Sequence, residues 1–228
     1  FEGRLVPQDL ENEKLEYQGY RLNLFSESNE YTLPKDWVMT SVEDLFEVIG
    51  GGTPSTKVDE YWNGDIPWIT SADIHGIRDI KPRKHITSIA IKESATSEVP
   101  SGSIIVVTRV SLGKVALTDF PLCFSQDSQG LIPKHRYIKT DFALYYLSYA
   151  ARFFKSKSRG TTISGITKKT LKKLPFPVPP LEDQKQIINK IDEIMTHIDI
   201  LEKNTSLSIQ RAKYLKQSIL KFAFEGNL

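Results

Sequence analysis

Residues 187–222, IINKIDEIMTHIDILEKNTSLSIQRAKYLKQSILKF, carry the pattern that decides the architecture of this chain. Between Ile187 and Phe222 the seam positions step by four and three residues without a slip, and eight of the eleven are large and apolar. Such spacing is typical of a coiled-coil seam. We therefore predict a long helix that starts within Glu182–Lys185 and runs to about residue 223, roughly 60 Å at 1.5 Å per residue.

A small domain cannot cover a rod of that length, so the seam predicts pairing with a second helix. The residues predicted to pair are Ile187, Ile191, Ile194, Ile198, Leu201, Leu215 and Ile219. Packing of the seam on the globular part of the same chain is the alternative. The centre of the seam is weak, because Thr205, Ser208 and Ala212 occupy it. Polar seam residues lower stability but fix register; a helix break near Asn204 is the other interpretation.

The segment before this helix is rich in β-branched and apolar runs separated by turn residues, which predicts strands over much of residues 53–133. A short helix is predicted over Ser41–Ile49, with Ser41 as N-cap and Asp44 at the capping-box position, ended by Gly50-Gly51-Gly52. A second helix is predicted over Asp141–Phe154. Four prolines in LPFPVPPL, residues 174–181, predict an extended connector.

These patterns predict an α+β fold: a mixed, β-rich domain with short helices, followed by a long coiled-coil-type helix. We expect a connector over residues 1–30, a recognition domain over 31–180 and the long helix over 181–228.

Catalytic and metal-binding motifs are not found in the sequence. The four histidines lie far apart without partners at metal-ligand spacing, and no phosphate-binding GxxxxGK[ST] loop is present. We therefore expect no catalytic residue, metal or bound cofactor. The single cysteine, Cys123, is interpreted as a small core residue; it cannot form an internal disulfide, which fits a reducing, cytoplasmic location.

Charge is strongly segregated along the chain, although the net charge is only +2. Residues 1–60 hold 13 acidic and 5 basic side chains, a net charge of −8. Residues 131–173 hold 11 Lys and Arg but one acidic side chain, Asp141, a net charge of +10. A basic block of this size indicates a polyanion partner, with a merely solvated basic face as the alternative.

Candidate DNA-binding residues fall into two groups. Phosphate contacts are predicted where basic side chains flank the Ser/Thr/Gly-rich stretch 160–165, at Lys155, Lys157, Arg159, Thr161, Thr162, Ser164, Lys168 and Lys169. Base-edge contacts are predicted in TRVSLGK and FSQDSQG, at Arg109, Ser111, Gln126 and Gln129, since Arg suits guanine and Gln suits adenine. Lys114, in the first of these stretches, is also predicted to bind DNA. Each of these two stretches is also compatible with a plain β-turn.

The two ends of the chain resemble each other. Phe1–Leu5 reads FEGRL and Phe224–Leu228 reads FEGNL, an identity of four in five residues. This indicates that the chain is about one period of a longer repeat.

Taken in order, several stretches resemble the specificity (S) subunit of Type I restriction–modification systems. They are LPKDW, GGTPST, WNGDIPWITSADI, PSGSIIVVTRVSLGKVA, TTISGITKKTLKKLPFPVPPLEDQKQI and AFEGNL. The family has two target-recognition domains, each followed by a long helix, and each domain reads half of a split DNA site. The resemblance implies one such unit here, either the C-terminal half of a subunit or a half-length one.

The resemblance also implies partners. They are double-stranded DNA, methyltransferase (M) subunits that bind S-adenosylmethionine and methylate adenine N6, restriction (R) subunits, and a second S half or a second copy of this chain through the long helix. Two other hypotheses stay open: a fragment of a fused restriction–methyltransferase enzyme, and a coiled-coil assembly module.

Overall fold

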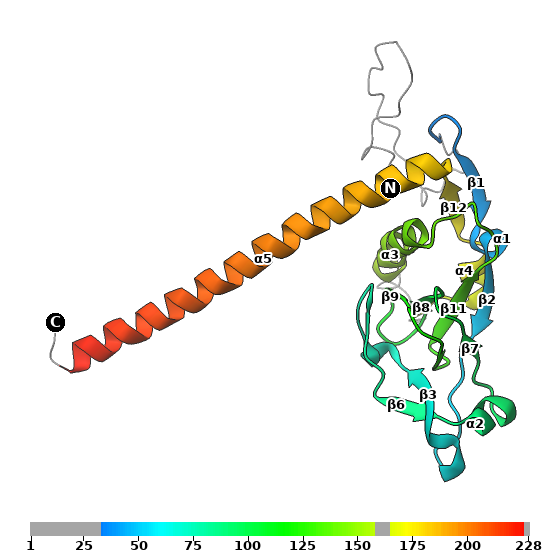
Figure 1. The fold of residues 1–228 in the computed structure, drawn as a ribbon, viewed down its shortest axis with the longest axis horizontal. Coiled ribbons are helices and arrows are strands. Elements are labelled where there is room, and N and C mark those ends of the chain that lie inside the picture. The colour runs from blue at the N-terminus through cyan, green and yellow to red at the C-terminus, as the bar shows by residue number, and fades with distance from the viewer. Residues whose placement is uncertain (1–32, 158–164, 226–228) are drawn as a thin grey trace. The chain divides into compact units, whose positions relative to one another are not determined.

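The computed structural model of the protein describes residues 33–157 and 165–225 (Figure 1). The chain divides into two units, Phe1–Lys185 and Gln186–Leu228. The first holds all the strands of the described residues and the second holds most of one long helix, so the predicted fold class is confirmed. The division into a recognition domain over 31–180 and a spacer over 181–228 stays a prediction.

One four-stranded sheet of the first unit is antiparallel throughout, in the order β2-β11-β8-β9. All four residues of β8 are buried, as a run of Ile and Val predicts for an inner strand. The strands are β2 (Phe46–Gly50), β8 (Ile104–Val107), β9 (Val115–Leu117) and β11 (Ser128–Pro133).

The other four-stranded sheet has the order β6-β3-β10-β7, and only β3 and β10 run parallel. Its strands are β3 (Trp62–Ile69), β6 (Lys84–Ile86), β7 (Glu98–Val99) and β10 (Leu122–Phe124). A smaller hairpin pairs β4 (Ile74–Gly76) with β5 (Asp79–Ile80). Short helical turns lie at η1 (Asp59–Tyr61), η2 (Ser71–Asp73) and α2 (Ser88–Glu93).

The main core joins the two four-stranded sheets. Leu122 and Phe124 of β10 share one buried cluster with Ile105 and Val107 of β8. Cys123, between them, belongs to a second cluster with Trp68 and other residues, because successive side chains of a strand point to opposite faces. Its thiol is fully buried, and burial raises its pKa to about 12. Cys123 is therefore the core residue that the sequence predicted.

The proline-rich connector forms a strand of its own. β12 (Pro175–Val178) pairs antiparallel with β1 (Val38–Ser41) in a two-stranded sheet, where prolines are tolerated because the sheet continues no further. Phe176 between two prolines is fully buried against Phe46 and Tyr146, with ring centroids 6.1 and 4.4 Å away. Tyr146 lies on α3 (Thr140–Lys157), which confirms the predicted helix there.

The helix predicted over Ser41–Ile49 is correct only in its first half. Ser41 and Asp44 form the predicted capping box on α1 (Val42–Leu45), but the chain then becomes β2. Phe46 to Gly50 pairs with β11 instead, so long-range strand pairing overrides the helical spacing of Phe46 and Ile49.

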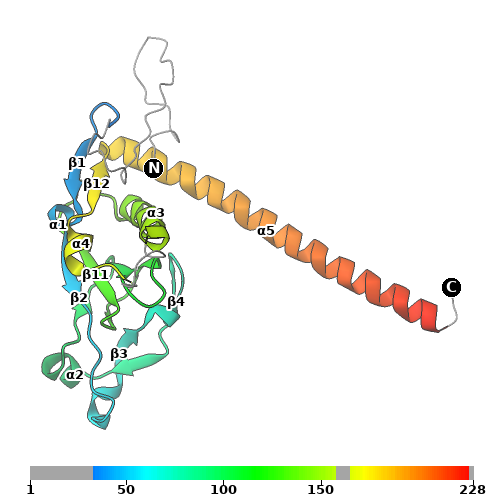
Figure 2. The ribbon, with the colours of Figure 1, turned by 180° about the vertical axis from the view of Figure 1, so that it is seen from behind.

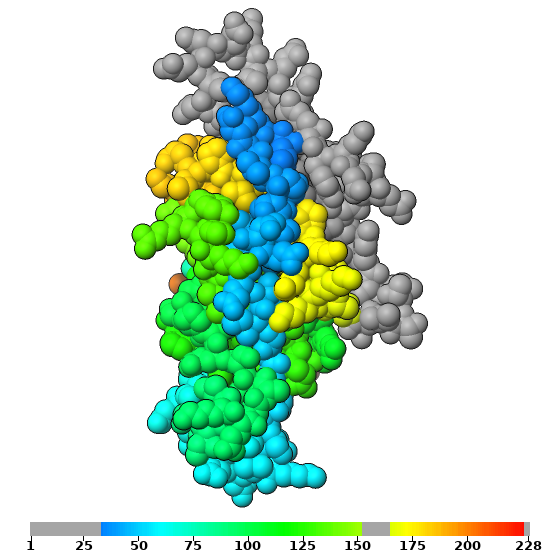
Figure 3. All heavy atoms as spheres, turned by 90° about the vertical axis from the view of Figure 1, so that its right-hand side faces the viewer, coloured from blue at the N-terminus to red at the C-terminus, as the bar shows by residue number. Residues whose placement is uncertain are grey.

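A one-turn helix, α4 (Lys168–Lys172), lies beside α1. Figures 2 and 3 show it, in yellow, next to the blue segment that holds β1 and α1. An ion pair between Lys172 and Glu43, 3.8 Å apart, spans this contact.

The long helix, α5 (Leu181–Phe224), begins one residue earlier than predicted. Its first turn is anchored in the first unit by the buried amide of Gln184. Gln184 Oε1 accepts from Lys139 N at 2.7 Å, and Nε2 donates to Tyr137 O and Pro179 O at 2.9 Å each. Trp37 Nε1 also donates to the carboxylate of Asp183 at 3.3 Å.

α5 is continuous from end to end, and its 44 residues span roughly 66 Å. The break near Asn204 is therefore not found. Thr205 Oγ1 and Ser208 Oγ donate to the carbonyls of Leu201 and Asn204, one turn back, at 2.8 and 2.9 Å. Of the seven predicted pairing residues Ile187 is buried and Ile191 half-buried, whereas five are exposed: Ile194, Ile198, Leu201, Leu215 and Ile219. None of the described helices is both long and apolar enough to cross a membrane.

The glycine run after β2 yields a first testable prediction. A Cβ on Gly51 would lie 2.4 Å from the carbonyl oxygens of Phe124 and Ser125, whereas one on Gly76 would meet nothing closer than Asp79 Cβ at 3.5 Å. Gly51→Ala should therefore lower the free energy of unfolding by about 1–3 kcal/mol, as overpacking does, while Gly76→Ala should change it by well under 1 kcal/mol. Urea denaturation of both variants checks this; equal midpoints would contradict the close approach.

Candidate nucleic-acid interface

Two turns of the first unit are tied together at a single carbonyl group. Thr108 and Arg109 follow β8, and Asp127 precedes β11. The Asp127 carbonyl oxygen accepts from Thr108 N at 2.8 Å, Arg109 N at 3.2 Å and Thr108 Oγ1 at 3.1 Å. The turn that carries Arg109 and the turn that carries Gln126 are therefore adjacent.

A third segment joins them just before α4. Ile166 N donates to Thr108 O at 2.7 Å. A Cβ on Gly165 would lie 2.9 Å from that same oxygen and 3.3 Å from Arg109 Cγ, so glycine permits the approach. Thr167 then caps α4 by accepting from Thr170 N at 3.0 Å, which places exposed Lys168 and Lys169 in the first turn.

The fourth segment is the glycine run, which the sequence analysis did not assign to the site. Gly51 N and Gly52 N donate to the carbonyls of Ser128 and Phe124 at 3.4 and 2.9 Å. The Thr53 hydroxyl then donates to Gln126 Oε1. We call these four segments together, Gly50–Thr53, Thr108–Lys114, Ser125–Asp127 and Gly165–Lys169, the recognition loops.

The recognition loops contain six of the predicted DNA-binding residues. Five of them are exposed: Arg109, Ser111, Gln126, Lys168 and Lys169. Ser111 has a φ of 63°, in keeping with its place in a tight turn. A positively charged fork, an amide and two ammonium groups are thus available at one edge of the unit. These are the side chains that meet base edges and phosphates in DNA complexes.

Two other predicted residues are less accessible. Gln129 lies in β11 with 9% of its surface exposed, and its buried Oε1 atom has no hydrogen-bond partner among the described residues. Lys114 is half-buried, and its ammonium group donates to Ser71 O and Ile74 O at 2.8 Å each. The structure thus gives Lys114 a positioning task, and the DNA contacts of both residues stay predictions.

The remaining predicted residues are described only in part or not at all. Lys155 and Lys157 lie in the last turn of α3, but their side chains are outside the described part of the chain. Arg159, Thr161, Thr162 and Ser164 also lie outside the described residues. Their DNA contacts stay predictions.

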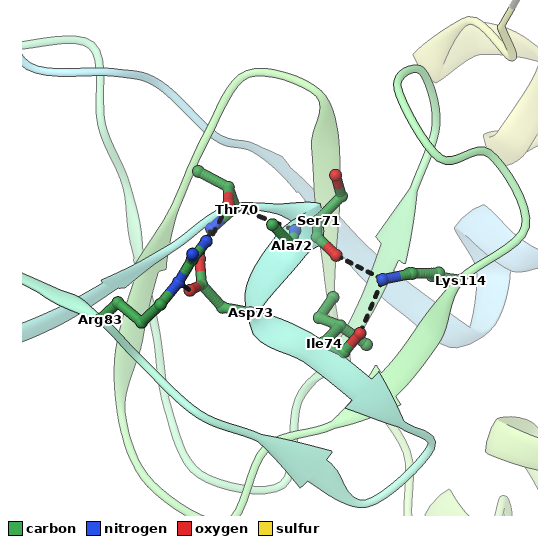
Figure 4. A network of polar contacts seen from close by, with 7 residues as sticks. All are labelled: Thr70, Ser71, Ala72, Asp73, Ile74, Arg83 and Lys114. Carbon is green, nitrogen blue, oxygen red and sulfur yellow. Dashed lines mark hydrogen bonds and ion pairs between the residues drawn. The ribbon is translucent and has the colours of Figure 1, made fainter.

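The acceptors of Lys114 belong to a polar network around η2, shown in Figure 4. Thr70 caps this turn, and the Asp73 carboxylate accepts from Thr70 N and Thr70 Oγ1, both at 2.8 Å. Arg83 Nε donates to the other oxygen of the same carboxylate. One short turn therefore holds Arg83 on one side and Lys114 on the other. The capping-box spacing of Thr70 and Asp73 is the sequence signal that could have located it.

The electrostatics of Asp73 follow from this network. Burial disfavours the charged carboxylate, whose side chain is only 4% exposed, but Arg83 and the Thr70 donors outweigh burial and hold the pKa of Asp73 below its usual 3.8. The charged form is therefore the one that the fold selects.

A pH-dependent prediction follows. A lowered folded-state pKa contributes stability that is fully present above the unfolded pKa and is lost as pH falls through the folded pKa. Asp73→Asn should lower the unfolding free energy by about 1–2 kcal/mol at pH 7, and the deficit should shrink as pH falls below 3.8. Thermal unfolding at pH 7 and at pH 3 measures it.

Asp79→Asn is the matched control, because the ion pair between Asp79 and Lys81, 3.3 Å apart, is exposed on both sides. We expect it to cost well under 1 kcal/mol at either pH. A deficit of Asp73→Asn that does not depend on pH would contradict the role given to the Asp73 charge.

Comparison with known proteins assigns the family. The family described as "Type I restriction modification DNA specificity domain" matches residues 34–211, most of the chain. The MjaIX specificity subunit of Methanocaldococcus jannaschii is 36% identical over 186 residues, 79% of this chain and 42% of the relative. The EcoR124I/EcoR124II specificity subunit of Escherichia coli is 30% identical over 216 residues, 92% of this chain and 51% of the relative.

Solved structures share the fold. A chain from a study of assembly and conformational transition of the type I R-M system has a TM-score of 0.74 at 24% identity, covering 90% of this chain and 50% of that one. The HsdS subunit of Thermoanaerobacter tengcongensis has a TM-score of 0.65 at 23% identity, covering 89% and 48%. The protein belongs to the Type I restriction–modification specificity family, as its resemblance predicted. It spans about half the length of the curated relatives it matches.

Proposed function

We propose that this chain reads one half of a split DNA sequence for a Type I restriction–modification system. The observation that carries the proposal is the meeting of exposed Arg109 and Gln126 on two adjacent turns, with Lys168 and Lys169 beside them. Arg pairs with guanine O6 and N7, and Gln with adenine N6 and N7, whereas Lys meets phosphates. A surface that only bound DNA without selecting sequence would need the lysines alone.

In this proposal the chemistry belongs to partner subunits. The chain recruits methyltransferase subunits, which bind S-adenosylmethionine and methylate adenine N6, and restriction subunits for cleavage. The family description and the names of the relatives, specificity subunits of Type I restriction enzymes, support this assignment. The recognition domain over 31–180 and the spacer over 181–228 would be the two working parts.

The first test separates base reading from phosphate binding. The target sequence is obtained by mapping N6-methyladenine in a host that co-expresses this chain with a Type I methyltransferase subunit. Affinity is then measured against salt on target and non-target duplexes. Arg109→Ala should cost about 1–3 kcal/mol on the target and little on other sequences. Lys168→Ala with Lys169→Ala should weaken binding on both and reduce the salt slope by about 1.8.

Lys35→Ala is the control, because Lys35 is exposed in the turn before Trp37 and belongs to none of the recognition loops. Equal affinity of the unsubstituted chain for all duplexes would contradict sequence reading and favour the coiled-coil assembly module. A loss on Arg109→Ala that is the same on target and non-target DNA would make Arg109 a phosphate contact.

The exposed seam of α5 is proposed to pair with a second helix, from another copy of this chain or from a second S half. Five apolar seam residues from Ile194 to Ile219 are exposed, Leu201 and Leu215 by 64% and 62%. Apolar seam positions gain stability only when a facing helix removes them from water.

The pairing test places one charge in the seam. Ile198→Asp should abolish self-association, because an unpaired charge buried in an apolar interface is too costly. Ile200→Asp is the matched control, since Ile200 is likewise exposed on α5 but lies outside the seam. Sedimentation should show a 25.9 kDa monomer for Ile198→Asp and twice that mass for the control. A dimer in both variants would place the interface elsewhere.

A further inference from the structure

A second basic cluster lies outside the recognition loops, on the edge strand of the other four-stranded sheet. The sequence KPRKH, residues 81–85, leads into and forms most of β6, which is the outermost strand of its sheet. Lys81, Arg83, Lys84 and His85 are all exposed. None of these residues is among those predicted from the sequence to bind DNA, and none takes part in the proposed function.

Two of these side chains, Arg83 and Lys84, are held in place by other residues. The Nε atom of Arg83 is committed to Asp73, so the outer part of its guanidinium group projects from a buried anchor; the Arg83 side chain is 66% exposed and that of Asp73 only 4%. Lys84 Nζ lies 5.2 Å from the centroid of the Trp62 ring, a cation–π arrangement. Positioned cations lose less conformational entropy when they bind a ligand.

Trp62 is itself fixed. Its ring meets Trp68 edge-on, at 5.4 Å between centroids and an angle of 85°, and Nε1 donates to Ser55 O at 3.1 Å. A fixed ring beneath Lys84 gives that ammonium group a defined place.

The backbone next to this cluster is specialised as well. The pairing of β3 with β6 shifts register between Trp62 and Ile66, a bulge. Within it Asn63 has a φ of 61° and is exposed, and a Cβ on Gly64 would lie 2.3 Å from Ile86 O. The bulge thus presents an amide beside the cations.

These residues line a pocket of about 480 Å³. Its walls are Thr56, Asp59, Trp62, Asn63, Gly64, Arg83, Lys84 and His85. The mixture of cations, amide, hydroxyl and one carboxylate suits the edge of a DNA duplex, which offers phosphates next to hydrogen-bonding bases.

The recognition loops and this pocket are linked through one turn. Arg83 binds Asp73 of η2, and Lys114, at the end of the turn that carries Arg109, binds Ser71 O and Ile74 O of the same segment (Figure 4). The recognition loops and β6 are thus fixed to opposite sides of one short turn, which keeps the distance between them constant.

We propose that Arg83, Lys84 and His85 form a second contact with the phosphate backbone of the same duplex that the recognition loops read. The inference rests on the proposed function. In this proposal β6 binds the phosphate backbone of the DNA and so sets the orientation of the duplex. These three residues make no base-specific contact.

The first test is the salt dependence of DNA affinity. Lys84→Gln keeps the Arg83–Asp73 pair intact and removes one cation. It should reduce the slope of log affinity against log salt by about 0.9, so that raising salt from 50 to 200 mM costs roughly threefold less affinity than in the unsubstituted chain. Target and non-target duplexes should be affected alike. Lys35→Gln is the matched control of equal charge change.

The second test reports proximity and does not depend on affinity. His85→Cys is coupled to an iron chelate that cleaves nearby DNA; the one native thiol, Cys123, is fully buried and will not react. We expect strand cuts at defined positions of the bound target duplex, and none from the same label on Lys35→Cys.

The two proposals fail in different ways. An unchanged salt slope in Lys84→Gln, together with no cuts from position 85, would overturn the second contact while Lys168 and Lys169 variants still weaken binding. Failure of the unsubstituted chain to bind any duplex would overturn the proposed function and this inference with it. Weaker binding confined to the target sequence would overturn the phosphate assignment by making Lys84 a base reader.

Discussion

Three donors from Thr108 and Arg109 converge on the carbonyl oxygen of Asp127, and the arrangement of the recognition loops follows from that convergence. A buried or half-buried backbone carbonyl has two lone pairs to satisfy. Here they are satisfied by a neighbouring turn, so two loops that are remote in sequence move as one. In the same way the carbonyl oxygen of Thr108 accepts from Ile166 N, which ties the segment just before α4 to the two turns. Arg109, Lys168 and Lys169 on these segments stay exposed, because the three segments are tied together by main chain and one hydroxyl.

The core beneath these loops explains how they can stay in place. A single buried cluster contains Ile105 and Val107 of β8 together with Leu122 and Phe124 of β10. Each of the two turns tied at Asp127 directly follows one of these two strands. Burial of four such side chains contributes several kcal/mol, at about 1.5–3 kcal/mol each. Substitution of an exposed loop residue such as Arg109 or Gln126 removes none of that burial. The buried residues that hold the loops in place are therefore distinct from the exposed side chains that the loops offer to a ligand.

Periodicity predicted the elements that are governed by local pattern and missed those governed by long-range pairing. The seam from Ile187 to Phe222 predicted a helix that starts within Glu182–Lys185 and ends at about residue 223, close to the observed Leu181–Phe224, because 4-3 spacing sustained over five heptads is a strong helix signal. Phe46 and Ile49 had helical spacing over only a few residues, and pairing with β11 decided their state. Exposed turns at Arg109 and Gln126 could be located from polar residues between apolar runs. The burial of Gln129 and the hydrogen bonds of Lys114 to Ser71 and Ile74 could not be predicted from the sequence, because both depend on segments that are distant along the chain.

The long helix also combines tertiary anchoring with local pattern: its first turn is held by the first unit, whereas the exposed apolar seam beyond it depends on local sequence. Helix formation has a costly nucleus and favourable propagation. The first turn of α5 is fixed by Gln184, whose amide bonds three backbone groups of the first unit, so the nucleus is supplied by the globular fold. Propagation then depends on the local sequence, and Thr205 and Ser208 in the middle of the seam satisfy their hydroxyls on the helix itself. A partner helix therefore need not provide hydrogen bonds at the centre, yet it cannot gain apolar contact there either. Only registers that align the apolar stretches at either end of the seam with apolar residues of the partner are favourable, so the polar centre limits the ways in which a second helix can pair.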